Sequence, residues 1–227
     1  MALMEVSIHE RDSVAAEDDP NVVRFVGKLR EMAVRVALVI LRTRYLIQAQ
    51  PLSLLSGQEK RFEIKKWQTI TGYRLFVETG TFLGQTTIEM ADVFEHCWTV
   101  EIDEKLYEEA LSRFRSRSNI TAICGSSGDH MASILESIDS PAIFWLDGHY
   151  SSHDTGRADI DTPILRELDQ ILNHPIKDHV ILIDDARDFL GINGYPTISG
   201  LRRFVRTRSP YRVRLSNDII HLVNDAL

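Results

Sequence analysis

Three aspartates that follow two apolar runs could together bind a metal ion. Asp147 comes directly after the run Ala142–Leu146, and Asp184 and Asp185 come directly after Val180–Ile183. If both runs are neighbouring parallel strands, their carboxyl ends meet at one edge of a sheet, where ligands bind. Three carboxylates there would repel one another unless a hard divalent cation such as Mg²⁺ lies between them. The alternative is that each aspartate caps a helix or faces water on its own.

A histidine close to the first of these aspartates is a candidate base. His149 lies two positions past Asp147, and a neutral imidazole can accept a proton near pH 7. His153 and Asp154, in the loop 151–161 that follows, are alternative candidates for the base. An isolated histidine is usually a surface residue, so this interpretation depends on the metal site beside it.

A glycine-containing turn follows the first apolar run of this region and could bind a ligand through its backbone. The pattern is E-x-G-x-x-x-G, from Glu78 through Gly80 to Gly84. Glycine permits a sharp turn and a close approach to a ligand, and the helix that follows offers free N–H groups. The dinucleotide fingerprint G-x-G-x-x-G is absent, because position 82 is Phe. On its own the turn is equally consistent with a structural role.

The second and third apolar runs also end in residues suited to binding. Glu101 lies 21 positions after Gly80, about where an acidic side chain binds both hydroxyls of a ribose. Its alternative role is a helix N-cap, but Asp103 fits that role better. The third run ends in Cys124-Gly125-Ser126-Ser127-Gly128-Asp129. Its small residues could lie along an adenine ring, and we expect Asp129 to cap the next helix.

These residues require a doubly wound α/β domain to bring them together. Near-continuous apolar runs alternate with helical stretches from residue 74 onward, which is typical of parallel strands covered by helices on both faces. The strands are predicted at 75–77, 97–100, 120–124, 142–146 and 180–183, followed by a hairpin at 211–215 and 219–223. Helices are predicted at 86–93, 104–115, 130–137, 163–173 and 199–205. Cys97 and Cys124 would then lie too far apart for a disulfide.

Taken together, the motifs resemble those of class I S-adenosylmethionine-dependent methyltransferases. The resemblance is strongest to the Mg²⁺-dependent O-methyltransferases of the macrocin type, which act on sugar hydroxyls, and it covers about residues 74–223. It rests on the loop 78–84, Glu101, Leu146-Asp147-Gly148 and Asp184-Asp185. It implies a seven-stranded, mostly parallel sheet in the order 3-2-1-4-5-7-6.

The resemblance also implies ligands and roles. S-adenosylmethionine would be the cofactor, and Mg²⁺ or another divalent cation the metal. The cofactor-binding residues would be Glu78, Gly80, Thr81, Gly84, Glu101, Ser126, Ser127 and Asp147, with Gly80 and Gly84 along the methionine part. Asp147, Asp184 and Asp185 would bind the metal, and His149 and Asp147 would be catalytic.

Two departures from the family pattern bear on these roles. Ser126 stands where the family has an acid at the end of strand three, which affects the adenine contact. The loop 151–161 separates Asp147 from Asp184 by more than the family pattern, and we expect it to shape the acceptor pocket or act as a lid. The expected activity is methyl transfer to a hydroxyl of a small molecule, such as a sugar. The alternatives are another metal-binding enzyme of this fold, of the hydroxylase kind, and a non-catalytic cofactor-binding scaffold whose basic helix binds a partner.

The charge pattern divides the chain. The formal net charge is −7 and the pI is about 5.6, which speaks against a nucleic-acid partner. Residues 1–20 are predicted to be a mobile acidic tail, 21–70 a helical extension and 71–227 the cofactor-binding domain. The extension includes a basic helix at 21–49. We expect it to pack on the core, cap the active site or form a homodimer, in preference to attachment to an anionic membrane.

Three further expectations concern the ends of the domain and the compartment. A second helix is predicted at 58–69, with Phe62 and Trp67 as its apolar anchors. Six arginines lie within residues 202–214, and we interpret them as a solvated face. The sequence shows no secretory signal pattern and has two cysteines without metal-ligand spacing, so we expect a cytoplasmic protein.

Overall fold

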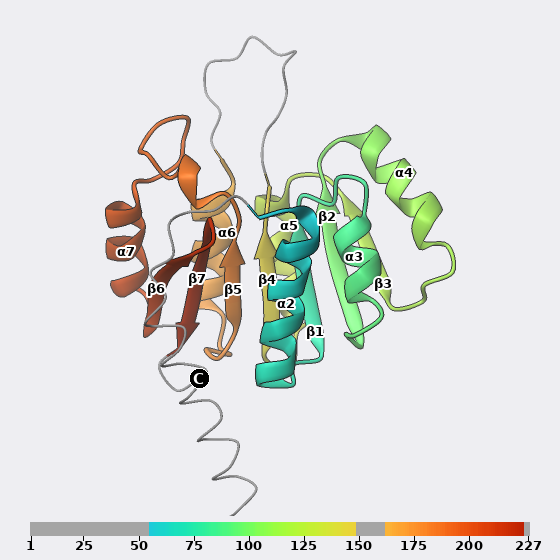
Figure 1. Ribbon diagram of the computed structural model, residues 1–227, viewed down its shortest axis with the longest axis horizontal. Coiled ribbons are helices and arrows are strands. Elements are labelled where there is room, and N and C mark those ends of the chain that lie inside the picture. The colour runs from blue at the N-terminus through green and yellow to red at the C-terminus, as the bar shows by residue number, and fades with distance from the viewer. Residues whose placement is uncertain (1–54, 149–161, 225–227) are drawn as a thin grey trace, which may run out of the picture. The chain divides into compact units, whose positions relative to one another are not determined.

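Seven strands form one sheet in the order β3-β2-β1-β4-β5-β7-β6, which confirms the predicted topology (Figure 1). The computed structural model describes residues 55–148 and 162–224. The pairs among β1 to β5 are all parallel, and β7 pairs antiparallel with both β5 and β6. The predicted basic helix 21–49 and tail 1–20 lie outside the described residues.

All predicted strands and helices of the domain are found in the structure. The strands are β1 (Leu75–Thr79), β2 (His96–Glu101), β3 (Ile120–Cys124), β4 (Ala142–Leu146), β5 (Val180–Ile183), β6 (Tyr211–Ser216) and β7 (Ile219–Asn224). The helices are α2 (Gly57–Thr71), α3 (Gln85–Met90), α4 (Glu104–Phe114), α5 (Ser127–Glu136), α6 (Ile164–Asn173) and α7 (Ile198–Arg206). A short 3₁₀ helix, η1 (Ala186–Asp188), follows β5 and was not expected from the sequence. None of the helices in these ranges has the length and apolar character needed to cross a bilayer.

Helices cover both faces of the sheet, which explains the near-continuous apolar strands. Every residue of β1, β4 and β5 is buried. Side chains alternate between the faces along a strand, so Val77 packs in the core with Leu168 of α6 and Leu201 of α7. Phe76 points the other way and packs in a second core with Ile64 of α2.

Helix α2 begins at a capping box and is part of this second core. The Ser56 hydroxyl accepts from the Glu59 N–H, and the Glu59 side chain accepts from the Ser56 N–H. Ile64 and Trp67 are buried, three positions apart on one helix face. The predicted anchor Phe62 is wrong: its position falls on another face, and it is 68% exposed.

The packing of α2 changes how the domain is divided. Residues 57–70, which the sequence analysis assigned to a helical extension, contribute to the same core as β1 and β4. The described residues from 55 onward form a single compact unit. The sheet and α2 therefore support the site together.

The C-terminal hairpin is tied to the loop after β5. Its two turn residues, Asn217 and Asp218, have φ values of 52° and 63°, as a two-residue type I′ turn requires. The Asp218 carboxylate accepts from the Arg187 N–H, and the Asp218 carbonyl accepts from the Ala186 N–H. The hairpin thus fixes η1 beside the carboxyl end of β5.

The two cysteines are both unpaired, as the strand assignment predicts. Cys97 lies opposite Ile120 near the start of β2, and Cys124 lies opposite Glu101 at its end. Their separation along parallel strands confirms the register expected from the apolar runs.

Candidate functional site

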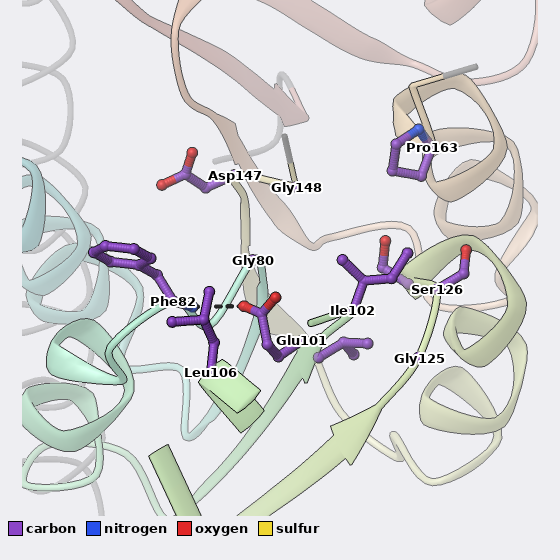
Figure 2. Close-up of a pocket in the computed structure, with 12 residues that line it drawn as sticks. Gly80, Phe82, Glu101, Ile102, Leu106, Gly125, Ser126, Asp147, Gly148 and Pro163 are labelled. Carbon is purple, nitrogen blue, oxygen red and sulfur yellow. Dashed lines mark hydrogen bonds between the residues drawn. The ribbon is translucent and has the colours of Figure 1, made fainter. Parts of the chain in front are cut away.

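A cavity of about 250 Å³ lies at the carboxyl ends of β1 to β4 (Figure 2). The strand order reverses between β1 and β4, and open α/β sheets bind ligands at such a switch point. The residues that line the cavity are Gly80, Phe82, Val100, Glu101, Ile102, Leu106, Gly125, Ser126, Ser127, Asp147, Gly148 and Pro163. Five of the predicted cofactor residues are in this lining: Gly80, Glu101, Ser126, Ser127 and Asp147.

Glu101 is held in the cavity wall by backbone groups. Its Oε2 accepts from the Phe82 N–H at 2.7 Å, and its Oε1 accepts from the Asp103 N–H at 2.9 Å. Each carboxylate oxygen has a further lone pair, so Glu101 can still accept hydrogen bonds from two hydroxyls of a ligand. The alternative role as N-cap of α4 is filled by Asp103, whose carboxylate accepts from two N–H groups of the first turn.

Gly80 is required because the loop after β1 touches the end of β4. Its φ is +83°, and a Cβ there would lie 2.3 Å from the Asp147 carbonyl oxygen. No side chain can be accommodated against backbone at that distance. The Gly80 N–H donates to the Val100 carbonyl at 2.9 Å, which fixes the loop against β2 as well.

Three of the predicted cofactor residues, Glu78, Thr81 and Gly84, are not in the cavity lining. The Thr81 hydroxyl is buried in a 2.6 Å hydrogen bond with the Thr99 hydroxyl. A Cβ on Gly84 would lie 2.7 Å from the Phe114 ring, so this glycine is needed for packing against α4. These three residues therefore hold the loop after β1 in place and do not face the cavity.

Glu78 is a buried carboxyl beneath the glycine loop. It is 2% exposed, and the hydroxyls of Thr87 and Thr99 donate to its Oε2. Burial raises the pKa of Glu78 to about 8, and the charge of Asp147 adds to the rise. Burial thus favours the protonated form of this carboxyl.

A second buried carboxyl, that of Glu167, lies near Gly148 of the cavity lining. Glu167 of α6 is 1% exposed, and a Cβ on Gly148 would lie 3.7 Å from its Oε1. Burial raises the pKa of Glu167 to about 7, while the neighbouring hydroxyls of Ser127 and Thr79 oppose the rise. Glu167 was not among the candidate residues predicted from the sequence.

The three predicted metal ligands come together. One carboxylate oxygen from each of Asp147, Asp184 and Asp185 lies within 4.8 Å of the other two. The Asp184 N–H donates to the Leu146 carbonyl, which aligns the ends of β5 and β4. Asp185 adopts the left-handed conformation, with φ 52° and ψ 51°, a strained state for a residue other than glycine. Three oxygen ligands at this spacing fit a hard divalent cation.

The electrostatics of this acidic cluster favour a cation. The side chain of Asp184 is fully buried. Burial raises the pKa of Asp184 to about 7, and the neighbouring charges of Asp147 and Asp185 add to the rise. Lys60, which donates to Asp184, opposes this rise.

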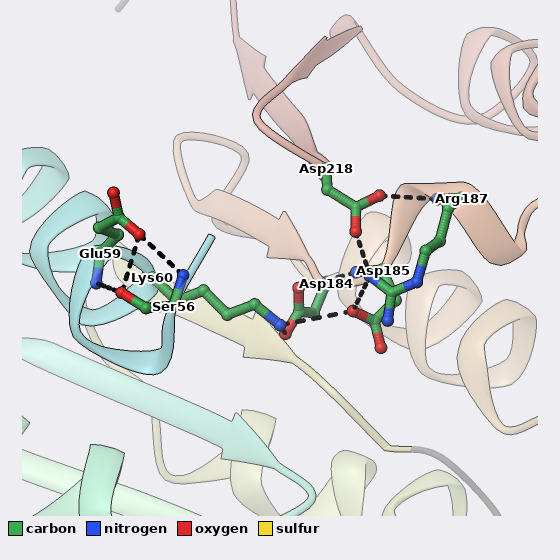
Figure 3. A network of polar contacts seen from close by, with 7 residues as sticks. All are labelled: Ser56, Glu59, Lys60, Asp184, Asp185, Arg187 and Asp218. Atoms are coloured by element: carbon green, nitrogen blue, oxygen red, sulfur yellow. Dashed lines mark hydrogen bonds and ion pairs between the residues drawn. The ribbon is translucent and has the colours of Figure 1, made fainter. Parts of the chain in front are cut away.

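Basic side chains that the sequence analysis missed contact the cluster (Figure 3). Lys60 Nζ lies 2.5 Å from Asp184 Oδ2 and 3.4 Å from Asp185 Oδ1. Arg187 Nη1 lies 2.8 Å from Asp185 Oδ1 and also forms an ion pair with Asp218. Lys60 could have been found from its position four residues before Ile64, which places it on the face of α2 that packs on the sheet.

One predicted cap is wrong, and one predicted base is outside the described residues. Helix α5 starts at Ser127 with Ser126 as N-cap, so Asp129 lies within its first turn and pairs with Arg166 at 2.5 Å. His149, the loop 151–161 and the rival bases in that loop fall outside the described ranges 55–148 and 162–224.

This architecture is similar to that of solved methyltransferase structures. The sequence gives no significant match to any protein-family model or curated protein sequence. An O-methyltransferase from Bacillus cereus in complex with S-adenosylhomocysteine (SAH) superposes with a TM-score of 0.54 at 17% identity, covering 85% of this chain and 91% of that one. The O-methyltransferase TomG from Streptomyces achromogenes, involved in tomaymycin synthesis and bound to S-adenosylmethionine, gives 0.53 at 16% identity over 93% of both chains. The chain has the class I methyltransferase fold.

A third structure with the methyltransferase fold is similar at lower coverage. The SAH-bound methyltransferase PaMTH1 from Podospora anserina gives a TM-score of 0.54 at 13% identity, covering 75% of this chain and 79% of that one. The methyltransferase fold of the present chain thus carries a cavity at its switch point and an acidic cluster at the next pair of strands. Asp147 belongs to both.

Proposed function

We propose that the protein transfers a methyl group from S-adenosylmethionine to a hydroxyl of a small molecule. The observation that carries this proposal is the position of Asp147, which lines the cavity and also belongs to the acidic cluster. A cofactor in the cavity would therefore lie next to the cluster. The fold, shared with O-methyltransferases that bind this cofactor or its product, supports the same assignment.

The cavity residues suit the parts of this cofactor. Glu101 would bind the two ribose hydroxyls, because each of its oxygens accepts one backbone hydrogen bond and has a lone pair left for a ligand. Ser126 and Ser127 would lie along the adenine ring. Gly80 and Asp147 would lie along the methionine part, where the close approach of their backbones leaves no side chain in the way.

Asp147, Asp184 and Asp185 would hold a divalent cation such as Mg²⁺. When bound, such a cation would supply positive charge that lowers the pKa of an acceptor hydroxyl. His149 follows Gly148 of the cavity lining in the sequence, and we propose that it accepts the proton of that hydroxyl. Holding the acceptor oxygen in line with the methyl group would supply much of the rate.

The acceptor we propose is a small molecule with free hydroxyls, such as a sugar, rather than a nucleic acid. The net charge of −7 would repel a polyanion. Asp147, Asp184 and Asp185 would hold a cation whose positive charge suits an acceptor with hydroxyl oxygens.

The test is methyl transfer from labelled S-adenosylmethionine to a panel of sugars and diols, with and without EDTA. Asp147→Ala should abolish turnover, and SAH binding by calorimetry should remain. Asp139→Ala, which changes an exposed aspartate outside the cluster, should retain wild-type turnover. Turnover that persists in EDTA would contradict the metal role, and a wild-type protein that does not bind SAH would contradict methyl transfer.

A further inference from the structure

The ammonium group of Lys60 contacts the Asp184 oxygen that the backbone does not engage. Lys60 Nζ contacts Asp184 Oδ2 at 2.5 Å, while Asp184 Oδ1 already accepts from the Asp185 N–H at 2.8 Å. Both oxygens of this fully buried side chain are therefore engaged. The same amine lies 3.4 Å from Asp185 Oδ1.

A divalent cation and this ammonium group exclude each other. A cation bound to Asp184 and Asp185 would share an oxygen, or adjacent oxygens, with Lys60 Nζ. Two positive charges at such a distance inside the protein repel strongly, because the effective dielectric constant is far below that of water. Lys60 must move before a cation can bind the cluster with full strength.

Lys60 is built so that it can move, whereas the other cation of the cluster is not. Its amine is carried on a flexible four-carbon stem, and its side chain is 22% exposed in the first turns of α2. Arg187, in contrast, is held by Asp185 and by the buried Asp218 at the same time. Withdrawal of Lys60 to solvent leaves the backbone of α2 in place, since Ile64 and Trp67 anchor the helix.

We propose that Lys60 is the resident counter-ion of the acidic cluster and that a divalent cation binds only when Lys60 withdraws from Asp184. This inference rests on the proposed function in that the cluster is taken as a metal site. Lys60 is then a residue that sets metal affinity. It keeps three carboxylates together when no metal is bound, and it weakens metal binding in exchange.

The experiment is a titration of the full chain with Mn²⁺ by calorimetry. Lys60→Met removes the competing charge and should bind Mn²⁺ at least about tenfold more tightly than the wild type. Lys60→Arg keeps the charge in a form that binds carboxylates with two N–H groups, so it should bind Mn²⁺ more weakly than the wild type. Lys65→Met is the matched control, because Lys65 lies on the same helix but pairs with Glu89; its Mn²⁺ affinity should be unchanged.

The outcomes separate this inference from the proposed function, with SAH binding measured on the same samples. Equal Mn²⁺ affinity in the wild type and both Lys60 variants would overturn the inference and leave the methyltransferase proposal intact. Absence of Mn²⁺ binding in all proteins, with SAH still bound, would overturn the inference and the metal role together. If Lys60→Met does not fold, the comparison of wild type with Lys60→Arg decides: weaker binding supports the inference, and equal binding overturns it.

Discussion

The two halves of the carboxyl edge of the sheet hold their carboxylates in different ways. In the cavity, Glu101 is fixed by two backbone N–H groups, 19 and 2 residues away in the sequence. In the acidic cluster, one oxygen of Asp184 accepts from the neighbouring Asp185 N–H, but the other is held by a lysine side chain 124 residues away. Backbone donors cannot leave without unfolding their loops, whereas a lysine can rotate into solvent.

This difference indicates different uses for the two halves. The cavity is preorganised for a ligand that fits a fixed set of acceptors, such as the hydroxyls of a ribose. The acidic cluster has a counter-ion that can be exchanged, which suits a bound cation that must enter and leave. Asp147 and Gly80 lie where the two halves meet.

The largest expected effect comes from disturbing this junction. Gly80→Ala places a methyl group against the Asp147 carbonyl in a left-handed backbone conformation, and should destabilise the fold by about 3 kcal/mol or more. Gly72→Ala is the control, because Gly72 has a similar φ of +69° with no atom within 4 Å of the added Cβ. It should lose only about 1 kcal/mol. Urea unfolding measures both, and equal losses would show that the junction is not tightly packed.

The next prediction tests the cavity half alone. Glu101→Ala removes the acceptor for ligand hydroxyls together with two loop hydrogen bonds, and should weaken SAH binding by about 100-fold. Its Mn²⁺ affinity should stay at the wild-type value, because the acidic cluster is untouched. Glu104→Ala, an exposed position in the next helix, is the control. A Glu101→Ala protein that binds SAH as well as this control would rule out the ribose role.

The third prediction uses Glu167, a buried carboxyl near the cavity floor. Its pKa is raised to about 7 in the folded state, so the folded protein binds more protons than the unfolded chain between about pH 4.5 and 7. Relative to low pH, the folded state therefore loses stability through this group as the pH rises from about 4.5 to 7, and the loss is complete above pH 7. Glu167→Gln should therefore match the wild type near pH 4.5 and exceed its free energy of unfolding at pH 8 by about 2 kcal/mol. Urea unfolding at both pH values is the measurement, and parallel pH profiles would contradict the raised pKa.

The smallest effect tests the helix that carries Lys60. Ser56→Ala removes the capping hydroxyl of α2 and should lower the free energy of unfolding by about 1 kcal/mol. Ser112→Ala removes an exposed hydroxyl that bonds within α4 and should leave stability within about 0.5 kcal/mol of wild type. Thermal unfolding compares them. If Ser56→Ala is as stable as Ser112→Ala, the capping box does not hold the start of α2.

The strands and most of the candidate site residues could be predicted from the sequence. The strands were predictable because burial on both faces makes them apolar throughout, as in β4 and β5. The meeting of Asp147, Asp184 and Asp185 followed from strand adjacency alone. Glu101 followed from its distance to Gly80 along the chain.

The remaining features depend on tertiary contacts that no local pattern fixes. Lys60 reaches the cluster only because α2 packs on the sheet with Ile64 inward. Phe62 was expected to be buried because it is apolar, yet the helix phase leaves it exposed. Asp129 was expected to be a cap because the sequence predicts a helix that starts at residue 130. Helix α5 begins three residues earlier, at Ser127, so Asp129 lies inside it.

The most direct test of the central claim is calorimetry of the full chain with SAH, in the presence and absence of Mg²⁺. We expect one SAH to bind per chain in both conditions, with affinity about 100-fold weaker in Glu101→Ala and unchanged in Asp147→Ala. A wild-type protein that shows no binding of SAH in either condition would contradict the assignment of the cavity to this cofactor.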